Sequence, residues 1–175
     1  VDLSKNHIKV LESSLFSGLT NLGNISLNNN LLEELPVTLF AGLTQLDTLG
    51  ISNNKLKKIP QGLFTNLSSL IELYLSNNDI NSLESNCFGG LNALDGLLLE
   101  HNSIEAITTN MFIGLGNLSI LNLNDNKIQA IEPLGFNGIN HLGNLYINNN
   151  QLTDAALTII AGLTTLLGLD LARNP

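Results

Sequence analysis

An asparagine recurs every 24 residues along the whole chain, without one insertion or deletion. A fixed period of roughly 20–50 residues is typical of chains built from stacked, equivalent units. The chain is therefore expected to fold as a solenoid, in which each turn contacts only its neighbours. The asparagines that set the period are Asn6, Asn30, Asn54, Asn78, Asn102, Asn126, Asn150 and Asn174.

Each asparagine closes the same phrase, which reads LGNISLNNN over residues 22–30 and LIELYLSNN over 70–78. In the first copy, Ile25 and Leu27 fall on one side of an extended chain, whereas Ser26 and its polar neighbours fall on the other. Each repeat is thus expected to contribute one short strand, and the eight strands to form a parallel sheet.

The recurring asparagine lies where the chain turns out of the strand and leaves backbone groups without partners. Its side-chain amide can both donate and accept hydrogen bonds, so it can satisfy those groups in the neighbouring turn. An unpaired buried group costs about 1–3 kcal/mol. We therefore expect the eight asparagines to form a buried polar ladder.

Phenylalanine follows the same period, and only Ile160 interrupts it. Such spacing predicts a stack of rings along the outer, convex side of the solenoid. The pairs that follow, such as Gly42-Leu43 and Asn66-Leu67, are expected to turn the chain back toward the next strand. All six phenylalanines belong to this series: Phe16, Phe40, Phe64, Phe88, Phe112 and Phe136.

The repeat, L-x-x-L-x-L-x-x-N-x-L-x-x-L/I-P-x-x-x-F-x-G-L, resembles the 24-residue "typical" leucine-rich repeats of extracellular proteins. These include Toll-like receptor ectodomains, Slit proteins, small proteoglycans and variable lymphocyte receptors. The resemblance covers almost every residue and implies an α/β solenoid: a horseshoe with a parallel concave β-sheet, an asparagine ladder, a phenylalanine spine and a convex side of loops and short helical turns. The proline of the pattern is kept only at Pro36 and Pro60, and Glu84, Thr108 and Glu132 replace it later.

The register predicts a single domain over residues 1–175. The final phrase, LDLARNP, resembles the passage into a cysteine-bearing C-terminal cap, and the resemblance also implies an N-terminal cap. Neither cap is in the sequence, so we expect the chain to be a segment of a larger protein. The domain contains partial repeats at 1–20 and 165–175 and complete repeats at 21–44, 45–68, 69–92, 93–116, 117–140 and 141–164.

One stretch departs from the spine pattern. Residues 152–163, LTDAALTIIAGL, favour a short helix on the convex side, with Asp154 as its N-cap.

Composition and charge narrow the range of partners that the chain is expected to bind. The formal net charge is −8, and nucleic-acid binders need a positive field, so nucleic acid is an unlikely partner. No apolar run approaches about 18 residues, which argues against membrane insertion by this segment.

No pattern typical of an enzyme is readable: there is no catalytic triad and no phosphate loop, and no cofactor is expected. Asp95 and Glu100 could be imagined as an acid and a base, but a solvated acidic face is the commoner explanation. His7, His101 and His141 lie in different columns without metal-ligand spacing, so no metal is predicted.

Three further features each have an ordinary explanation beside a functional one. Cys87 occupies an apolar column, which favours a buried hydrophobe over a reactive thiol. Lys55, Lys57 and Lys58 form a basic cluster that favours a solvated edge over an anion site. Glycosylation sequons occur at Asn24, Asn66 and Asn117, in a number that chance would also give.

The outward positions of the sheet are free to suit a partner. Over the first two strands the outward positions carry no aromatic or aliphatic anchors. Between Ile71 and Tyr146 they carry such anchors with carboxylates around them, as in a protein-binding hot spot. The alternative is that these apolar residues are scattered and ordinary. The candidate ligand-binding residues are Ile71, Glu72, Tyr74, Leu98, Glu100, His101, Ile120, Asn122, Asp125 and Tyr146.

These features favour a non-enzymatic recognition module of an extracellular or cell-surface receptor-like protein, with a protein or glycan ligand on the concave sheet. A basic segment of the partner would meet the carboxylates favourably, and the resemblance suggests immune recognition or adhesion. The alternative is a structural adhesion or assembly module that spaces domains or self-associates. A third hypothesis is that the repeats hold substrates for a catalytic part located elsewhere.

Overall fold

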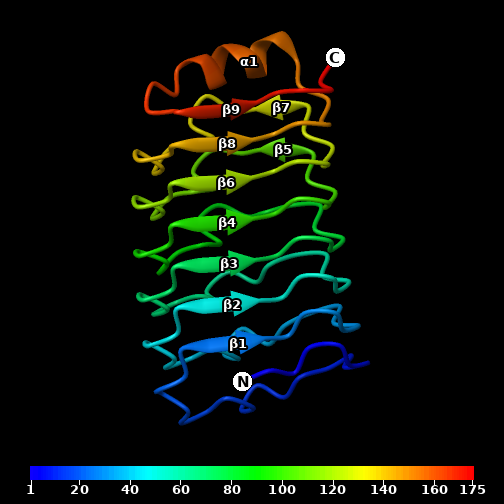
Figure 1. Cartoon of the computed structure of the whole chain (residues 1–175), viewed down its shortest axis with the longest axis vertical. Coiled ribbons are helices and arrows are strands. Elements are labelled where there is room, and N and C mark those ends of the chain that lie inside the picture. Colours follow the sequence, from blue (N-terminus) through cyan, green and yellow to red (C-terminus); the bar gives the residue numbers. More distant parts are fainter.

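The computed structural model describes residues 1–175, which form a stack of coils with one short strand in nearly every turn (Figure 1). Seven strands pair in parallel to form one sheet. Neighbours are aligned at a shift of 24 residues, so that Asn24 lies opposite Thr48 and Tyr74 opposite Leu98. In sheet order the strands are β1 (Asn24–Ser26), β2 (Thr48–Gly50), β3 (Glu72–Tyr74), β4 (Gly96–Leu98), β6 (Ile120–Asn122), β8 (Asn144–Tyr146) and β9 (Gly168–Asp170).

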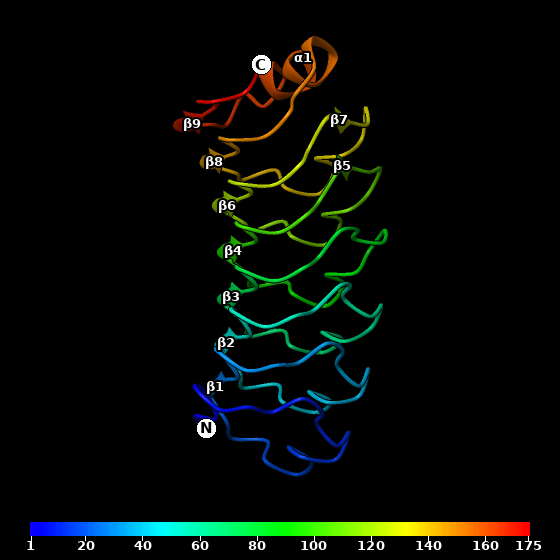
Figure 2. The ribbon, with the colours of Figure 1, turned by 90° about the vertical axis from the view of Figure 1, so that its right-hand side faces the viewer.

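The sheet lies along the inner side of a shallow arc, and turns form the outer side (Figure 2). This is the α/β solenoid, with a parallel concave sheet and a loop-rich convex side, that the resemblance to leucine-rich repeats implies. The expectation of eight strands is wrong by one. The first turn forms only an isolated bridge between Asp2 and Ser26.

One continuous core of 46 buried hydrophobic residues runs through the stack. Every strand of the main sheet except β9 contributes its central side chain, as Ile25 does in β1, and Leu27 just after β1 is also fully buried. The six phenylalanines are also buried, and four of the five neighbouring pairs stack with nearly parallel planes; Phe64 and Phe88, for example, have centroids 6.2 Å apart and planes 6° apart. Ile160 takes the place of the next ring and is 2% exposed.

The asparagine ladder is present, and every member from Asn30 to Asn174 joins two turns. Asn78 donates from Nδ2 to Leu75 O at 3.0 Å and to Ile51 O at 3.1 Å, and its Oδ1 accepts from the Leu56 N–H at 3.1 Å. Six asparagines of the ladder, from Asn30 to Asn150, are buried. Asn6 is exposed and Asn174 half-buried, because these outermost positions have a neighbouring turn on one side only.

A two-stranded parallel sheet on the convex side was not predicted. It joins β5 (Ala106–Ile107) to β7 (Ala130–Ile131), and the Glu132 N–H donates to Ile107 O at 2.9 Å. Pro36 and Pro60 hold the position of Glu132 in earlier repeats. Proline has no N–H to donate, so this hydrogen bond cannot form there. Glu84 and Thr108 hold the same position in the repeats between and do not form it either.

The predicted short helix is α1 (Asp154–Ala161), which packs beside β7. Its N-cap is Thr153 rather than Asp154: the Thr153 hydroxyl accepts from the Ala156 N–H at 3.4 Å. Asp154 lies in the first turn instead, where its negative charge suits the helix dipole. No helix of the structure has the length and apolar character needed to cross a membrane.

Candidate binding surface on the concave sheet

The strand register sets the outward residues of the sheet in straight columns. Tyr74, Leu98, Asn122 and Tyr146 occupy paired positions on four successive strands, β3, β4, β6 and β8. Glu72, Gly96 and Ile120 form the column beside them. Since neighbouring strands lie about 4.8 Å apart, the structure places both tyrosines, Leu98 and Ile120 within one patch. We call this patch, residues 71–146 of the inner sheet face, the concave surface.

The ten candidate residues differ in accessibility. Ile71, His101 and Tyr146 are exposed, and the other seven are half-buried. Ile71 precedes β3 and lies in a marginal column, between Asp47 and Asp95. It therefore belongs to the edge of the concave surface rather than to its centre.

Glycines leave room for longer neighbours on this face. A Cβ added at Gly96 would overlap the Glu72 carboxylate, which shows that Glu72 lies across β4. A Cβ added at Gly50 would lie 2.5 Å from Asn28 Nδ2. The sequence columns contain these glycines, but their role as space for adjacent side chains becomes visible only in the structure.

The concave surface is negatively charged. The inward-facing segments 47–53, 71–77, 95–101, 119–125 and 143–149 contain five carboxylates and none of the seven Lys and Arg residues of the chain. Burial, and then the nearby Asp95, raise the pKa of Glu72. Burial and then Glu72 raise the pKa of Tyr74. Both shifts follow from negative groups held close together in a partly desolvated place.

Glu100 has an unusual environment. Its Oε2 atom is buried and has no hydrogen-bond partner, and it is the one side-chain oxygen or nitrogen in the structure of which this is true. Buried polar atoms are nearly always paired. Sequence reasoning selected Glu100 as a carboxylate on the rim of a patch and could not have found this property.

His101, Asp125 and Asn149 form a row beside Glu100. His101 Nε2 lies 3.7 Å from Asp125 Oδ2, and Asn149 Nδ2 donates to Asp125 Oδ1. All three residues have positive φ angles, between 51° and 55°. Asparagine is tolerated in this left-handed conformation more easily than most residues, and it holds four of the eight positions of this column.

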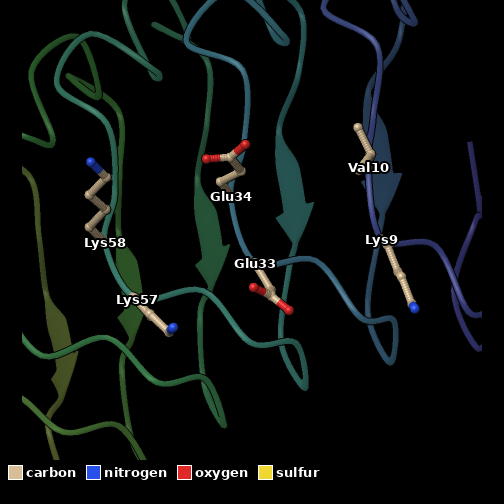
Figure 3. Close-up of a pocket in the computed structure, with 6 residues that line it drawn as sticks. All are labelled: Lys9, Val10, Glu33, Glu34, Lys57 and Lys58. Atoms are coloured by element: carbon tan, nitrogen blue, oxygen red, sulfur yellow. The ribbon is translucent and has the colours of Figure 1, made fainter.

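A cavity of about 610 Å³ lies on the lateral face, away from the concave surface (Figure 3). The turn that carries Glu33 and Glu34 runs between the turns that carry Lys9 and Lys57, so the charges alternate from one turn to the next. Lys57 and Lys58 of the predicted basic cluster therefore border carboxylates. The full lining is Lys9, Val10, Glu33, Glu34, Lys57 and Lys58.

The remaining candidate groups do not converge. No cluster of three or more His, Cys, Asp and Glu side chains could hold a metal ion. Cys87 is fully buried, as its apolar column predicts, and burial raises its pKa to about 12. The sequon asparagines, Asn24, Asn66 and Asn117, are all exposed.

The chain matches a family model and several solved structures. The model, described as "Leucine rich repeat", matches residues 1–56, 44–104 and 94–152. An internalin (inlF) from Listeria monocytogenes is 29% identical with a TM-score of 0.77, and TLR13 in complex with ssRNA13 is 28% identical with a TM-score of 0.92. Each alignment covers 99% of this chain, but 47% of the internalin chain and 24% of the TLR13 chain.

The Toll–Spatzle complex of Drosophila shows a likeness of fold alone. It is 24% identical, with a TM-score of 0.68, over 99% of this chain and 31% of that one. No curated protein matches the chain.

Proposed function

The chain belongs to the leucine-rich repeat family, and we propose that it is a non-enzymatic recognition module of an extracellular or cell-surface receptor-like protein. Its ligand, a protein or a glycan, binds to the concave surface. The 46-residue core, continuous from the first turn to the last, supports the proposal that residues 1–175 form one domain.

The observation that carries this proposal is the alignment of Tyr74, Leu98, Asn122 and Tyr146 across four adjacent strands. Their side chains project from a face that the core does not use. Tyrosine supplies contact area at low entropic cost and tends to dominate binding energy. The open sheet suits a protein-sized contact better than an enclosed small-molecule pocket.

One relative bears on the kind of ligand. The solved structure of TLR13 contains ssRNA13, which raises RNA as an alternative for this chain. The five carboxylates of the inner face and the net charge of −8 oppose it, because RNA binding draws on positive charge. We therefore propose a protein or glycan ligand rather than nucleic acid.

The extracellular setting is proposed from the resemblance of the repeats to those of extracellular proteins. The exposure of Asn24, Asn66 and Asn117 supports it, because each sequon is accessible for glycosylation. Self-association is the second candidate function. The alternating lysines and glutamates of the lateral cavity support it, since an antiparallel copy related by an axis between two turns would place Lys9 of each copy opposite Glu33 of the other.

The test begins with a binding screen of the chain against an array of extracellular proteins and glycans. Tyr74→Ala and Tyr146→Ala are then expected to weaken binding of the recovered ligand more than tenfold without a change in circular dichroism. Val37→Ala and Leu134→Ala, which shorten exposed side chains on the outer turns, serve as matched controls. Binding that depends on the control residues and not on the tyrosines would contradict the proposed site.

A further inference from the structure

The two tyrosines of the concave surface share a column, but their surroundings differ. Tyr146 is exposed, whereas Tyr74 is half-buried. Resting on the proposed function, we propose that the face around Tyr146 binds sugar rings of a neutral glycan, which stack on the tyrosine and bond to neighbouring amides. We call this place the Tyr146 site, and it consists of Tyr146, Asn122, Asn144, Asn148 and Asp170.

Polar side chains occupy the four positions nearest to Tyr146 on the inner face. Asn122 and Asp170 lie opposite it on the two adjacent strands, β6 and β9 (Figure 1). Asn144 and Asn148 lie two residues before and after it, and so project from the same face. Around Tyr74 the same four positions hold no amide. They are Gly50, Leu98, Glu72 and Ser76.

Most amide atoms of the Tyr146 site have no partner inside the protein. The Asn144 side chain forms no hydrogen bond, and Asn122 uses only Oδ1, which accepts from the backbone at 3.1 Å. Asn148 uses only Nδ2, which donates to Asp170 Oδ2 at 2.7 Å. The unpaired atoms of these half-buried asparagines are accessible to solvent, because the only buried side-chain atom without a partner belongs to Glu100.

Strand β9 leaves the ring of Tyr146 open on one side. Its outward positions beside Asp170 are Gly168 and Ala172, which have little or no side chain. A Cβ added at Gly168 would overlap the Asn144 side chain, which therefore lies across β9. From β6 to β9 the site spans two strand spacings, about 10 Å, which is enough for two sugar rings.

A sugar matches this arrangement in two ways. The C–H groups on one side of a sugar ring pack on an aromatic face, whose π-system carries partial negative charge. Sugar hydroxyls both donate and accept hydrogen bonds, as amides do. The unpaired groups of Asn122, Asn144 and Asn148 therefore suit the hydroxyls of a ring stacked on the tyrosine. An apolar protein side chain in the same place would leave these groups unpaired, at a cost for each.

The charges at the Tyr146 site favour a neutral sugar over an acidic one. Asp170 is its only ionised group, and both of its oxygens already accept hydrogen bonds, from Asn148 Nδ2 and from the Ala172 N–H. In the adjacent column Asp125 and Arg173 have opposite charges, so neither sign prevails there. A sialic acid or a sulfate group placed beside Asp170 would meet repulsion.

The experiment applies the labelled chain to a printed array of neutral oligosaccharides, built of hexoses and N-acetylhexosamines, and of their sialylated and sulfated counterparts. The chain is expected to bind neutral glycans more strongly than the acidic counterparts. Disaccharide fragments of the best binder are then titrated by NMR. Such a fragment on Tyr146 cannot also cover Tyr74, three strand spacings or about 14 Å away. The ring signals of Tyr146 should therefore shift, and those of Tyr74 should not.

Variants test the two kinds of contact separately. Tyr146→Ala is expected to weaken disaccharide binding roughly tenfold, whereas Tyr146→Phe keeps the ring and should stay within about twofold of the wild type. Asn144→Ala removes no hydrogen bond of the fold and should weaken binding roughly threefold. Tyr74→Ala is the matched control, because it should leave disaccharide binding unchanged while weakening binding of the intact ligand.

The outcomes separate this inference from the proposed function. The inference is overturned if no neutral glycan binds, if acidic glycans bind better, or if Tyr146→Ala or Asn144→Ala leaves disaccharide binding unchanged. A protein from the extracellular array that loses affinity in Tyr74→Ala would then keep the concave surface as the site of a protein ligand. Ligands that bind equally well without either tyrosine would count against both proposals.

Discussion

The asparagine ladder makes a sharp prediction at Asn78, whose contacts are fully defined. In Asn78→Ala the Leu56 N–H loses its only acceptor and becomes a buried, unpaired donor, at a cost of about 1–3 kcal/mol. Leu75 O and Ile51 O each lose one donor but keep a second, from Asn102 and Asn54 respectively. These two losses add roughly 0.5–1 kcal/mol each, so the total is roughly 2–5 kcal/mol.

Asn78→Asp is expected to be more damaging than Asn78→Ala, although it is closer in shape. The new oxygen replaces a donor that faces the carbonyls of Leu75 and Ile51, so a buried negative charge meets two acceptors. Protonation restores a donor, and the deficit should therefore shrink as the pH is lowered. Asn6→Ala, at the exposed end of the ladder, should cost less than about 1 kcal/mol.

The measurement is the free energy of unfolding in urea for Asn78→Ala, Asn78→Asp and Asn6→Ala, together with hydrogen exchange of the Leu56 amide. Local exchange is needed because repeat proteins can unfold in parts. The reasoning would be refuted if Asn78→Asp were as stable as the wild type at neutral pH. It would also be refuted if Asn6→Ala lowered the free energy of unfolding as much as Asn78→Ala does.

Three other predictions concern the core, the thiol and acid stability. Phe88 is stacked between Phe64 and Phe112, and its replacement by alanine should lower the free energy of unfolding in urea by about 3–5 kcal/mol. A decrease below about 1 kcal/mol would contradict its place in the core. The burial that raises the pKa of Cys87 to about 12 should make its alkylation at neutral pH far slower in the native chain than in urea, as followed by mass spectrometry; equal rates would show that the thiol is accessible. The hydrogen bond from Asn148 holds the pKa of Asp170 below its ordinary value of 3.8, so its stabilising effect is present above that value and disappears as the pH falls through the lower folded pKa. Acid titrations of unfolding should therefore show a smaller loss below pH 3.8 in Asp170→Asn than in the wild type, and identical curves would exclude this contribution.

The strict period explains why most of the fold could be predicted. Asn78 and its equivalents each lie at a strand end with unpaired backbone groups, and each bonds to those groups in the same way. The repeated hydrogen bonds therefore fix the register of the sheet. The same register predicts that Tyr74 and Tyr146 share a column. Strand geometry alone decides which residues face outward.

The features that escaped prediction depend on contacts between particular side chains. The pairing of β5 with β7 uses the N–H of Glu132, but Glu84 and Thr108 also have an N–H at this position and do not pair, so the residue type there does not predict it. The unpaired Glu100 Oε2 atom lies in a column where the Asn124 N–H is already bonded to Asn122 Oδ1, an arrangement of side chains that the repeat pattern does not contain. The choice of Thr153 over Asp154 as the N-cap shifts the helix start by one residue, which is within the usual uncertainty of such boundaries.

The most direct test of the central claim is to locate the ligand contact by site-specific photo-crosslinking. A photoreactive amino acid is placed at Leu98, in the middle of the concave surface, and in separate variants at Glu34 on the lateral face and at Leu134 on the outer turns. With the ligand recovered from the extracellular array, crosslinks are predicted from position 98 alone. Crosslinks from position 34 or 134, with none from 98, would contradict recognition by the concave sheet.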